Sequence, residues 1–352
     1  MTTISDIAKL SGVSPATVSK VINRRSGVGE ATTQRIWETI DQADFHPRSL
    51  AARRRRALLI LPNNPGAMQR SRYLRTAHAG LVEGALQAGL SLSTCGANYG
   101  SLSGASLRQM VRADGSRGAI LLATRNDYAL VDQLAIERIP HVVVGSSRHT
   151  QNVCQVVLDD EASSRAATQY LLDLGHRQIQ IVTCSRRDMG HDVRFSGYAQ
   201  AMQGAGLEVH QGVELNGVTL ASGAAAFEQI RSGGQHPTAV IVTNEVLAIG
   251  LLRAARAAGI SVPEKLSVLA YESSGDLALA DPSITAMVSP VFEMGREAIR
   301  LFISQIDRGE ASSSQNPTVA ESTTVCLAHS LMVRQTTAEQ VLDGRGREAS
   351  SW

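Results

Sequence analysis

The chain has 352 residues, of which 43% are hydrophobic and 19% are charged, and its formal net charge is +2. This length and balance exclude a disordered or fibrous chain and allow about two to three domains with cores of their own. No apolar run approaches the roughly 18–20 residues of a membrane span, and the first residues lack a signal-peptide pattern, so we expect a cytoplasmic protein without membrane contact. The cysteines form no C-x-x-C pair, so we expect reduced thiols and no metal site.

The charge is concentrated at one end of the chain. Residues 1–56 contain ten Lys and Arg residues against five acids, whereas the remainder contains 24 basic and 27 acidic residues. A small basic segment in front of a slightly acidic body is typical of a nucleic-acid-binding module joined to a domain with another ligand.

Residues 1–46 are predicted to form a small all-α head. Ser5 is expected to cap the first helix and Gly12 to end it, and Ser14 followed by Pro15 is a typical helix start. The expected helices cover residues 5–10, 16–22 and 30–43. The residues expected to face the core are Ile7, Ala8, Leu10, Val18, Ile22, Ile36, Trp37 and Ile40. Two short helices around a tight turn, braced by a third, predict a helix-turn-helix domain.

A basic tract, residues 47–57, follows the head. Its sequence begins PRSLAARRRR, which is too basic for a core and too rich in Ala and Arg for a flexible linker. We therefore expect a hinge that can become helical when its charge is neutralised.

From residue 58 onward, short apolar runs alternate with amphipathic stretches. The expected strands are 58–61, 119–123, 141–145, 153–158, 179–183, 239–243 and 266–270. The expected helices include 76–88, 128–138, 162–174, 193–205, 221–231, 246–258 and 293–306. Buried strands separated by crossover helices predict an α/β body of two doubly wound parallel-sheet lobes, with a ligand in the cleft between them. Residues 308–322 are expected to form a loop and 336–352 a mobile tail.

The opening TISDIAKLSGVSPATVSKVINRRSGVGEATTQRIWETIDQADFHP resembles the head of the LacI/GalR family of bacterial transcriptional regulators. Further matches follow in order along the body, among them LGHRQIQIVT, VRFSGYAQAM and SITAMVSPVFEMGREAIRLF, and the resemblance covers about residues 3–337. It implies a regulator, most simply a repressor, that binds a palindromic double-stranded DNA operator as a homodimer. A small metabolite in the cleft, a sugar or a sugar acid, would control it, with no cofactor and no catalysis.

The family's fold also implies how the chain divides into lobes of periplasmic-binding-protein type. The effector-binding and dimerisation domain would cover residues 58–335. Its N-lobe would contain about 58–158 and 289–318, and its C-lobe about 159–288 and 320–335.

The resemblance places the DNA contacts on the second helix of the head. Its first two residues, Pro15 and Ala16, match the family's main base readers and would read DNA by shape and by contact with thymine methyl groups. Lys20 stands where the family often has arginine, and it can reach guanine or a phosphate. The remaining expected contacts are Ser14, Thr17, Ser19 and Asn23.

The hinge arginines Arg53 and Arg54 are also expected to contact DNA. The family usually has a leucine at the position of Arg54, which wedges into the minor groove and kinks it. We favour insertion of Arg54 into a narrowed minor groove. The alternatives are that Leu50 supplies the wedge, or that the tract is a solvated basic linker without direct readout.

The resemblance further implies the effector contacts. Arg194 in VRFSGY matches a family arginine that grips the ligand, and Glu272 stands where the family has an aspartate that binds sugar hydroxyls or a base. Asn244, Asp188 and Tyr73 match further positions that face the ligand. For each of these residues, the alternative is a structural salt bridge or a surface position.

Two other classes of protein share parts of this pattern. A Rossmann-like enzyme would need a nucleotide motif, and neither G-x-G-x-x-G nor G-x-x-x-x-G-K-[ST] occurs in the chain. A periplasmic sugar-binding protein would share the two-lobed body but would have no use for a DNA-binding head. Both rivals are therefore less favoured than a regulator.

Overall fold

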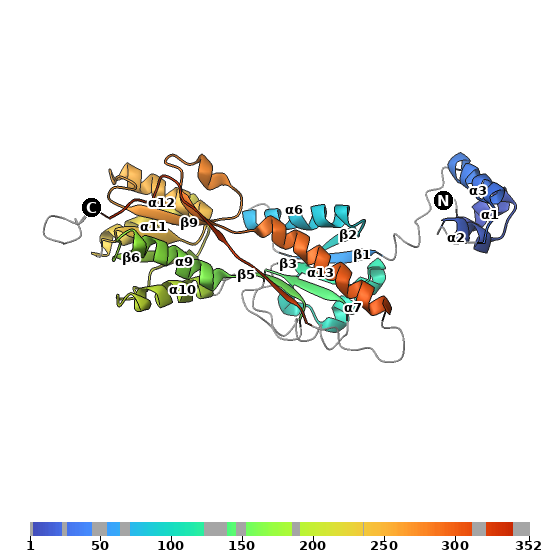
Figure 1. The fold of residues 1–352 in the computed structure, drawn as a ribbon, viewed down its shortest axis with the longest axis horizontal. Coiled ribbons are helices and arrows are strands. Elements are labelled where there is room, and N and C mark those ends of the chain that lie inside the picture. Colours follow the sequence, from blue (N-terminus) through green and yellow to red (C-terminus); the bar gives the residue numbers. More distant parts are fainter. Residues whose placement is uncertain are drawn as a thin grey trace.

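The computed structural model of the chain contains a small helical head and two α/β lobes (Figure 1). It describes residues 3–22, 27–43, 55–63, 71–122, 139–145, 153–184, 191–234, 236–311 and 322–340. None of the helices in these ranges combines the length and the apolar character that a membrane crossing requires.

The head consists of α1 (Ile4–Ser11), α2 (Pro15–Ile22) and α3 (Glu30–Gln42). Thr3, not Ser5 as predicted, caps α1, because it forms a capping box with Asp6 in which each side chain accepts a backbone N–H from the other residue. Gly12 ends α1 as predicted, in a left-handed conformation with a φ of 68°.

Residues from α1, α2 and α3 pack together in the core of the head. It contains Ile7, Ala8, Val18, Val21, Ile22, Ile36 and Ile40. Leu10, predicted to belong to the apolar face of α1, is 68% exposed. Trp37, predicted to face inward, is 38% exposed. It follows the fully buried Ile36, and consecutive helical residues point about 100° apart, so only one of the two can face this small core.

The first lobe is built on a parallel sheet with the strand order β11-β5-β4-β3-β1-β2. Its strands are β1 (Arg56–Pro62), β2 (Ser91–Ala97), β3 (Ala119–Leu122), β4 (His141–Val144), β5 (Gln155–Leu158) and β11 (Thr324–Leu327). Its helices are α6 (Arg72–Gln87), α7 (Gly104–Asp114), α13 (Val291–Ala311) and the short 3-10 helix η1 (Tyr99–Ser101).

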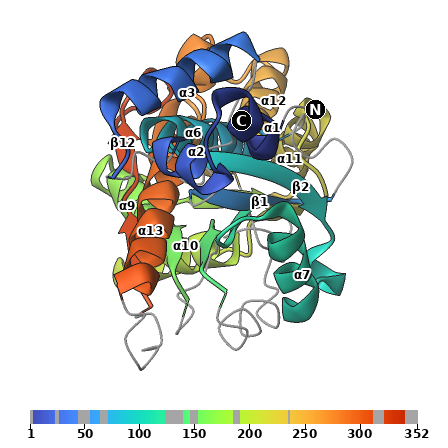
Figure 2. The same cartoon turned by 90° about the vertical axis from the view of Figure 1, so that its right-hand side faces the viewer.

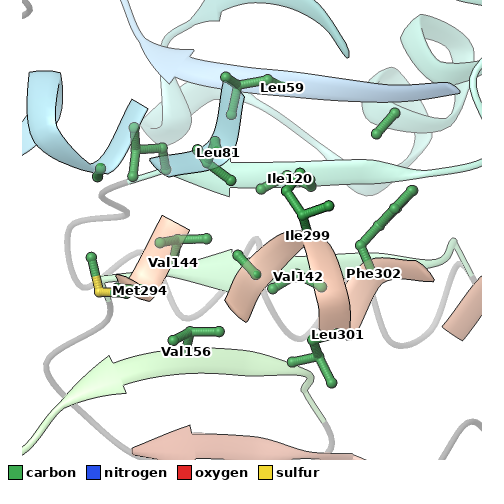
Figure 3. Close-up of a cluster of buried hydrophobic side chains, with 14 of the residues drawn as sticks. Leu59, Leu81, Ile120, Val142, Val144, Val156, Met294, Ile299, Leu301 and Phe302 are labelled. Atoms are coloured by element: carbon green, nitrogen blue, oxygen red, sulfur yellow. The ribbon is translucent and has the colours of Figure 1, made fainter. Parts of the chain in front are cut away.

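Alternate residues of β1 pack against different helices. Leu59 belongs to a core with Leu81 of α6 and Phe302 of α13 (Figure 3). Leu58 belongs to a second core that contains Leu107 of α7. Figure 2 shows β1 and β2 between α13 and α7, so both faces of the sheet are covered, and its inner strands β1, β3, β4 and β5 are apolar and buried along most of their length.

The second lobe has a sheet with the order β12-β10-β9-β8-β6-β7, in which only the β10–β12 pair among the described pairs is antiparallel. Its strands are β6 (Ile179–Cys184), β7 (Val213–Leu215), β8 (Ala239–Val242), β9 (Ser267–Glu272), β10 (Thr285–Val288) and β12 (Ser330–Met332). Its helices are α9 (Asp160–Asp173), α10 (His191–Gly204), α11 (Leu220–Ser232), α12 (Glu245–Ala257) and the 3-10 helix η2 (Asp276–Leu279).

The chain passes between the lobes after β5, after β10 and after β11. The last passage corrects the predicted lobe division, which placed all of residues 320–335 in the C-lobe. Thr324–Leu327 instead extends the first sheet by pairing with β5, and the dark-red segment that contains β11 and β12 runs from one lobe to the other (Figure 1). The first and third passages are joined by a hydrogen bond from Asp159 N to Leu327 O of 3.0 Å.

The segment that follows β12 also differs from its prediction as a mobile tail. Thr336 is buried, and its hydroxyl donates to Val268 O at 2.6 Å. Gln340 N donates to Leu174 O at 2.8 Å. Residues 336–340 are therefore part of the second lobe, and residues 341–352 lie outside the described ranges.

Other differences concern short or polar elements. Helix α7 and strands β2, β7, β10, β11 and β12 were not expected from the sequence. β2 is partly exposed along its length, so it lacks the apolar run by which the buried strands are recognised. Helix α13 continues to residue 311, into the predicted loop 308–322, and the predicted helix 128–138 lies outside the described ranges.

Candidate functional site

The outer surface of α2 carries the predicted DNA contacts. Pro15, Ala16 and Lys20 are exposed, whereas the helix's apolar residues Val18, Val21 and Ile22 face the core of the head. The Ser14 hydroxyl caps α2 by accepting Thr17 N at 3.1 Å, and it also lies 2.8 Å from the Thr17 hydroxyl. α2 has no acidic residue, so this surface can approach a polyanion without charge repulsion from the helix itself.

Three of the predicted DNA contacts lie outside the described residues. These are Asn23, Arg53 and Arg54. Leu50, the alternative wedge, is outside them as well.

A buried cluster of polar and aromatic side chains lies at the junction of the lobes, with Arg194 at its centre. The Arg194 Nε and Nη2 atoms donate to Asp160 Oδ1 at 2.9 and 2.8 Å, and Nη1 donates to Thr243 O at 2.9 Å. The guanidinium also lies over the ring of Tyr271, 4.0 Å from its centroid. Burial raises the pKa of the Asp160 carboxyl, and the adjacent Arg194 guanidinium opposes this rise.

Tyr271 and His329 form the next part of this cluster. The Tyr271 hydroxyl hydrogen-bonds the Ser163 hydroxyl at 3.0 Å, and burial raises the pKa of Tyr271 to about 12. The His329 ring meets the Tyr271 ring edge-on, with centroids 5.6 Å apart. His329 Nε2 is 3.4 Å from the same Asp160 oxygen that accepts both bonds from Arg194.

The first lobe contributes Tyr73 from the first turn of α6. Its hydroxyl lies 3.7 Å from Met294 Sδ, and it also packs against Gly145 at the end of β4. Burial raises the pKa of Tyr73, and the negative charge of Asp160 raises it further. Tyr73 of the first lobe therefore lies close enough to Asp160 of the second lobe for the charge of Asp160 to affect it.

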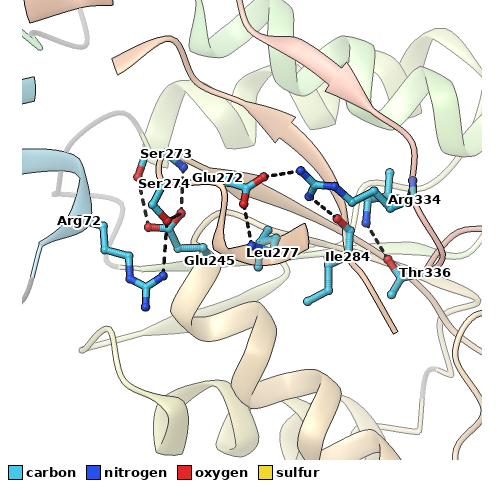
Figure 4. Close-up of polar contacts among 10 residues, drawn as sticks. Arg72, Glu245, Glu272, Ser273, Ser274, Leu277, Ile284, Arg334 and Thr336 are labelled. Atoms are coloured by element: carbon cyan, nitrogen blue, oxygen red, sulfur yellow. Dashed lines mark hydrogen bonds and ion pairs between the residues drawn. The ribbon is translucent and has the colours of Figure 1, made fainter. Parts of the chain in front are cut away.

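Two acidic residues at the carboxyl ends of the second lobe's strands hold neighbouring loops (Figure 4). Glu272 is 2% exposed; its Oε1 accepts Leu277 N at 2.6 Å and its Oε2 accepts Arg334 Nη2 at 2.8 Å. Glu245 accepts Ser273 N at 2.8 Å, and its carboxylate also accepts the hydroxyls of Ser273 and Ser274.

One contact in the same region links the two lobes directly. Arg72 of α6 forms an ion pair with Asp276, and its Nη1 donates to the Ser274 hydroxyl at 3.4 Å.

The predicted effector residues thus have different environments. Arg194 and Tyr73 lie in the junction cluster. Asn244 Oδ1 caps α12 by accepting Val246 N at 2.8 Å, and both oxygens of Glu272 take part in structural contacts. Asp188 lies outside the described residues.

Sequence reasoning missed Asp160, Tyr271 and His329. Asp160 lies two residues after the end of a buried strand, and the rule that ligands bind at the carboxyl ends of parallel strands could have singled it out. No local pattern marks His329, which reaches the cluster only through the path of the third crossover. Within the described part of the chain, no group of three or more His, Cys, Asp or Glu residues could hold a metal ion.

Comparison with known proteins adds to this geometry. Residues 3–48 match the family model of bacterial regulatory proteins of the lacI family, and residues 168–337 match that of the periplasmic binding protein-like domain. The HTH-type transcriptional regulator CelR of Thermobifida fusca is 30% identical over 319 residues, which span 86% of this chain and 92% of CelR. The HTH-type transcriptional regulator DegA of Bacillus subtilis (strain 168) is 27% identical over 350 residues, which span 96% of this chain and 98% of DegA.

Solved structures show the same fold. A complex of the transcriptional regulator CelR with cellobiose matches with a TM-score of 0.67 at 25% identity, covering 96% of this chain and 100% of that one. The lac repressor dimer bound to operator and the anti-inducer ONPF matches with a TM-score of 0.80 at 20% identity, covering 96% and 99% of the two chains. Both similarities extend over the head and the two lobes.

Proposed function

Because this chain belongs to the LacI family of bacterial transcriptional regulators, we propose that it represses transcription by binding a palindromic operator as a homodimer in the cytoplasm. A small metabolite that binds between the lobes changes its affinity for DNA. The observation that carries the proposal is the presence, in one chain, of a helix-turn-helix head and a buried polar cluster at the junction of two α/β lobes.

The exposed surface of α2 supports the assignment of the head. Pro15 and Ala16 are small enough to let the helix enter a major groove, and Lys20 supplies a positive charge for guanine or phosphate. Ser14, Thr17, Ser19 and Asn23 are the further proposed contacts of the head, and Arg53 and Arg54 those of the hinge.

The effector proposal rests on Arg194 and Tyr73, which approach the cluster from different lobes. Arg194 presents guanidinium N–H groups, and Tyr73 an aromatic ring that can pack against a sugar ring. Asn244, Glu272 and Asp188 are the other proposed contacts. CelR, whose complex contains cellobiose, makes a sugar or a sugar acid the first class of effector to test.

Selection of DNA fragments tests the proposal. The full-length protein should retain fragments that contain an inverted repeat, and light scattering should give the mass of a dimer. Lys20→Ala should weaken retention, whereas Lys265→Ala, which removes an exposed lysine from the second lobe, should not. The proposal would be refuted if the wild type retained fragments with and without an inverted repeat equally, and the Lys20 variant did the same.

A transport-type sugar-binding protein is the alternative that the periplasmic-binding-protein-like match of residues 168–337 favours. It predicts sugar binding without specific DNA binding. The same fragment selection, repeated with and without sugars, distinguishes the two functions.

A further inference from the structure

The two lobes of the body differ in charge. Residues 55–158 and 289–329, the part of the chain that contains the first lobe, hold 14 Arg residues against 10 Asp and Glu residues. Residues 159–288 and 330–340, the part that contains the second lobe, hold 10 Lys and Arg residues against 15 acids. The lobe that directly continues the basic hinge is therefore positive and the other lobe negative, which favours the approach of a polyanion from the side of the hinge.

The amino ends of β1 and β3 lie on this side of the first lobe. Arg117 N donates to Arg56 O at 2.9 Å, so the turn after α7 lies beside the start of β1. Strands β1, β3, β4 and β5 are parallel, and the chain enters the lobe junction at Asp159 after β5, so the amino ends of these strands lie at the opposite end of the lobe (Figure 1). We call residues 55, 56 and 112–117 the hinge-side surface.

Arginine dominates the charge of the hinge-side surface, which contains four arginines and one acid. The exposed arginines are Arg55, Arg112 and Arg117. The acid is Asp114, whose carboxylate accepts the Ser116 hydroxyl and lies 3.9 Å from Arg56 Nη1. The negative charge of Asp114 is therefore offset within the surface, and the surface as a whole is positive.

The hinge-side surface also contains the ends of α6 and α7. The C-terminal end of a helix has unpaired carbonyl groups and a partial negative charge, which repels a polyanion. Arg55 Nη1 donates to Ala88 O at the end of α6 at 3.4 Å, and Arg56 Nη1 donates to Asp114 O at the end of α7 at 3.1 Å. These two arginines offset the helix ends, so the other two arginines make the surface attractive to anions.

We propose that the hinge-side surface is a further DNA-binding surface, located on the body of the protein, and that it contacts backbone phosphates of the operator beside the hinge. Consecutive Cα atoms are only about 3.8 Å apart, so a DNA contact of Arg54 brings Arg55 and the adjacent Arg117 next to the same DNA. Guanidinium groups bind phosphate through paired N–H donors. The inference rests on the proposed function for the presence of DNA at the hinge.

Contacts of this kind have a characteristic effect on DNA affinity. Phosphate contacts fix the position of a protein on the duplex but carry no sequence information. Each contact releases counterions and adds about 0.9 to the slope with which log K falls against log[salt]. An arginine that only supports the fold contributes to the Tm but not to this slope.

Two matched variants of the full-length protein test the proposal. Arg112→Gln/Arg117→Gln removes two charges from the hinge-side surface and keeps side chains that can form hydrogen bonds. The two arginines that bond the helix ends stay in place. The control, Arg253→Gln/Lys265→Gln, removes two exposed charges from the second lobe.

The measurement is DNA affinity by fluorescence anisotropy between about 50 and 200 mM salt. The probes are the fragment that the wild type retains most strongly and versions of it with single base-pair changes. We expect the slope of log K against log[salt] to shrink by about two or more in the Arg112/Arg117 variant and to keep the wild-type value in the control. Across this range of salt, the advantage of the wild type in affinity should fall about tenfold or more. All probes should lose affinity by the same factor, because backbone contacts do not read bases.

The Tm of the variants distinguishes DNA binding from a structural role. Arg112 lies in the last turn of α7, where a positive charge stabilises the helix, so the Arg112/Arg117 variant should melt less than about 4 °C below the wild type. An unchanged slope in this variant would overturn the proposal, whatever its Tm. A slope that shrinks equally in the control would overturn it too, because the charge of the whole body would then act from a distance.

The same titrations separate this inference from the proposed function. If the wild type prefers an inverted repeat and the Arg112/Arg117 variant keeps the wild-type slope, only the DNA contact of the body fails. If the wild type shows no preference for an inverted repeat, the proposed function fails, and this inference fails with it.

Discussion

Glu272→Ala should destabilise the second lobe strongly. Both carboxylate oxygens of Glu272 are engaged, one with Leu277 N and the other with the Arg334 guanidinium, and the side chains of Glu272 and Arg334 are 0% and 15% exposed. The substitution therefore leaves a largely buried positive charge and a buried N–H group without their acceptor.

The expected loss follows from the burial of this pair. Removing one partner of a buried ion pair costs about 3–5 kcal/mol. Arg334 keeps its bond from Nη1 to Ile284 O of 2.7 Å, which favours the lower part of this range, about 3–4 kcal/mol. At about 2–4 °C per kcal/mol for a body of this size, the Tm should fall by about 6–16 °C.

Differential scanning calorimetry of the full-length variant measures this fall directly. Glu272→Gln keeps an acceptor for Leu277 N and should lose less, about 1–3 kcal/mol. The matched control is Glu228→Ala, which breaks an ion pair with Arg231 in which both side chains are about half exposed. That pair contributes about 0–1 kcal/mol, so the control should melt within about 3 °C of the wild type.

A fall in Tm of less than about 3 °C for Glu272→Ala would refute this reasoning, because it would mean that the pair contributes no more than an exposed one. If Glu272→Ala weakened effector binding at an unchanged Tm, the carboxylate would act on the ligand instead of on the loops that it holds.

Three further predictions concern pH, the placement of Tyr73 and DNA binding. The body should lose stability as the pH falls below about 6.5. Burial lowers the pKa of His176 to about 4 and that of His329 to about 3, so these histidines bind protons in the unfolded chain at a pH at which they stay uncharged in the folded one. An unfolding midpoint that stays constant in urea titrations from pH 7 to pH 5 would contradict this. Gly145→Ala should lower both the Tm and the effector affinity, each measured by calorimetry. Gly145 has a φ of 82°, which alanine rarely adopts, and a Cβ at this position would collide with the Tyr73 hydroxyl. In the double variant Gly145→Ala/Tyr73→Phe, the loss of the hydroxyl should relieve the collision. Operator affinity measured in gel shifts should fall steeply as the salt concentration rises. If Lys20 contacts a phosphate, Lys20→Ala should reduce the slope of log K against log[salt] by about one. An unchanged slope would mean that Lys20 does not contact the DNA backbone.

Much of the architecture follows from local signals in the sequence. The left-handed glycine after α1, the proline that begins α2 and the apolar runs of the central strands are read from a few neighbouring residues, and the structure agrees with each of them. Elements without such a signal were missed. β2 and β11 are partly exposed edge strands, and their pairing depends on a partner far away in the chain.

At the lobe junction, too, the sequence identified some residues and only the tertiary structure identified the others. The sequence, through its family resemblance, singled out Arg194 and Tyr73, because a motif marks a residue type at a position. It could not assign their neighbours. Asp160 and His329 are 169 positions apart and meet only because β11 joins the first sheet beside β5 before the chain returns to the second. Ion pairing and burial depend on distances between such distant segments, so the tertiary structure alone decided that Arg194 is held by Asp160 and that Glu272 holds Arg334.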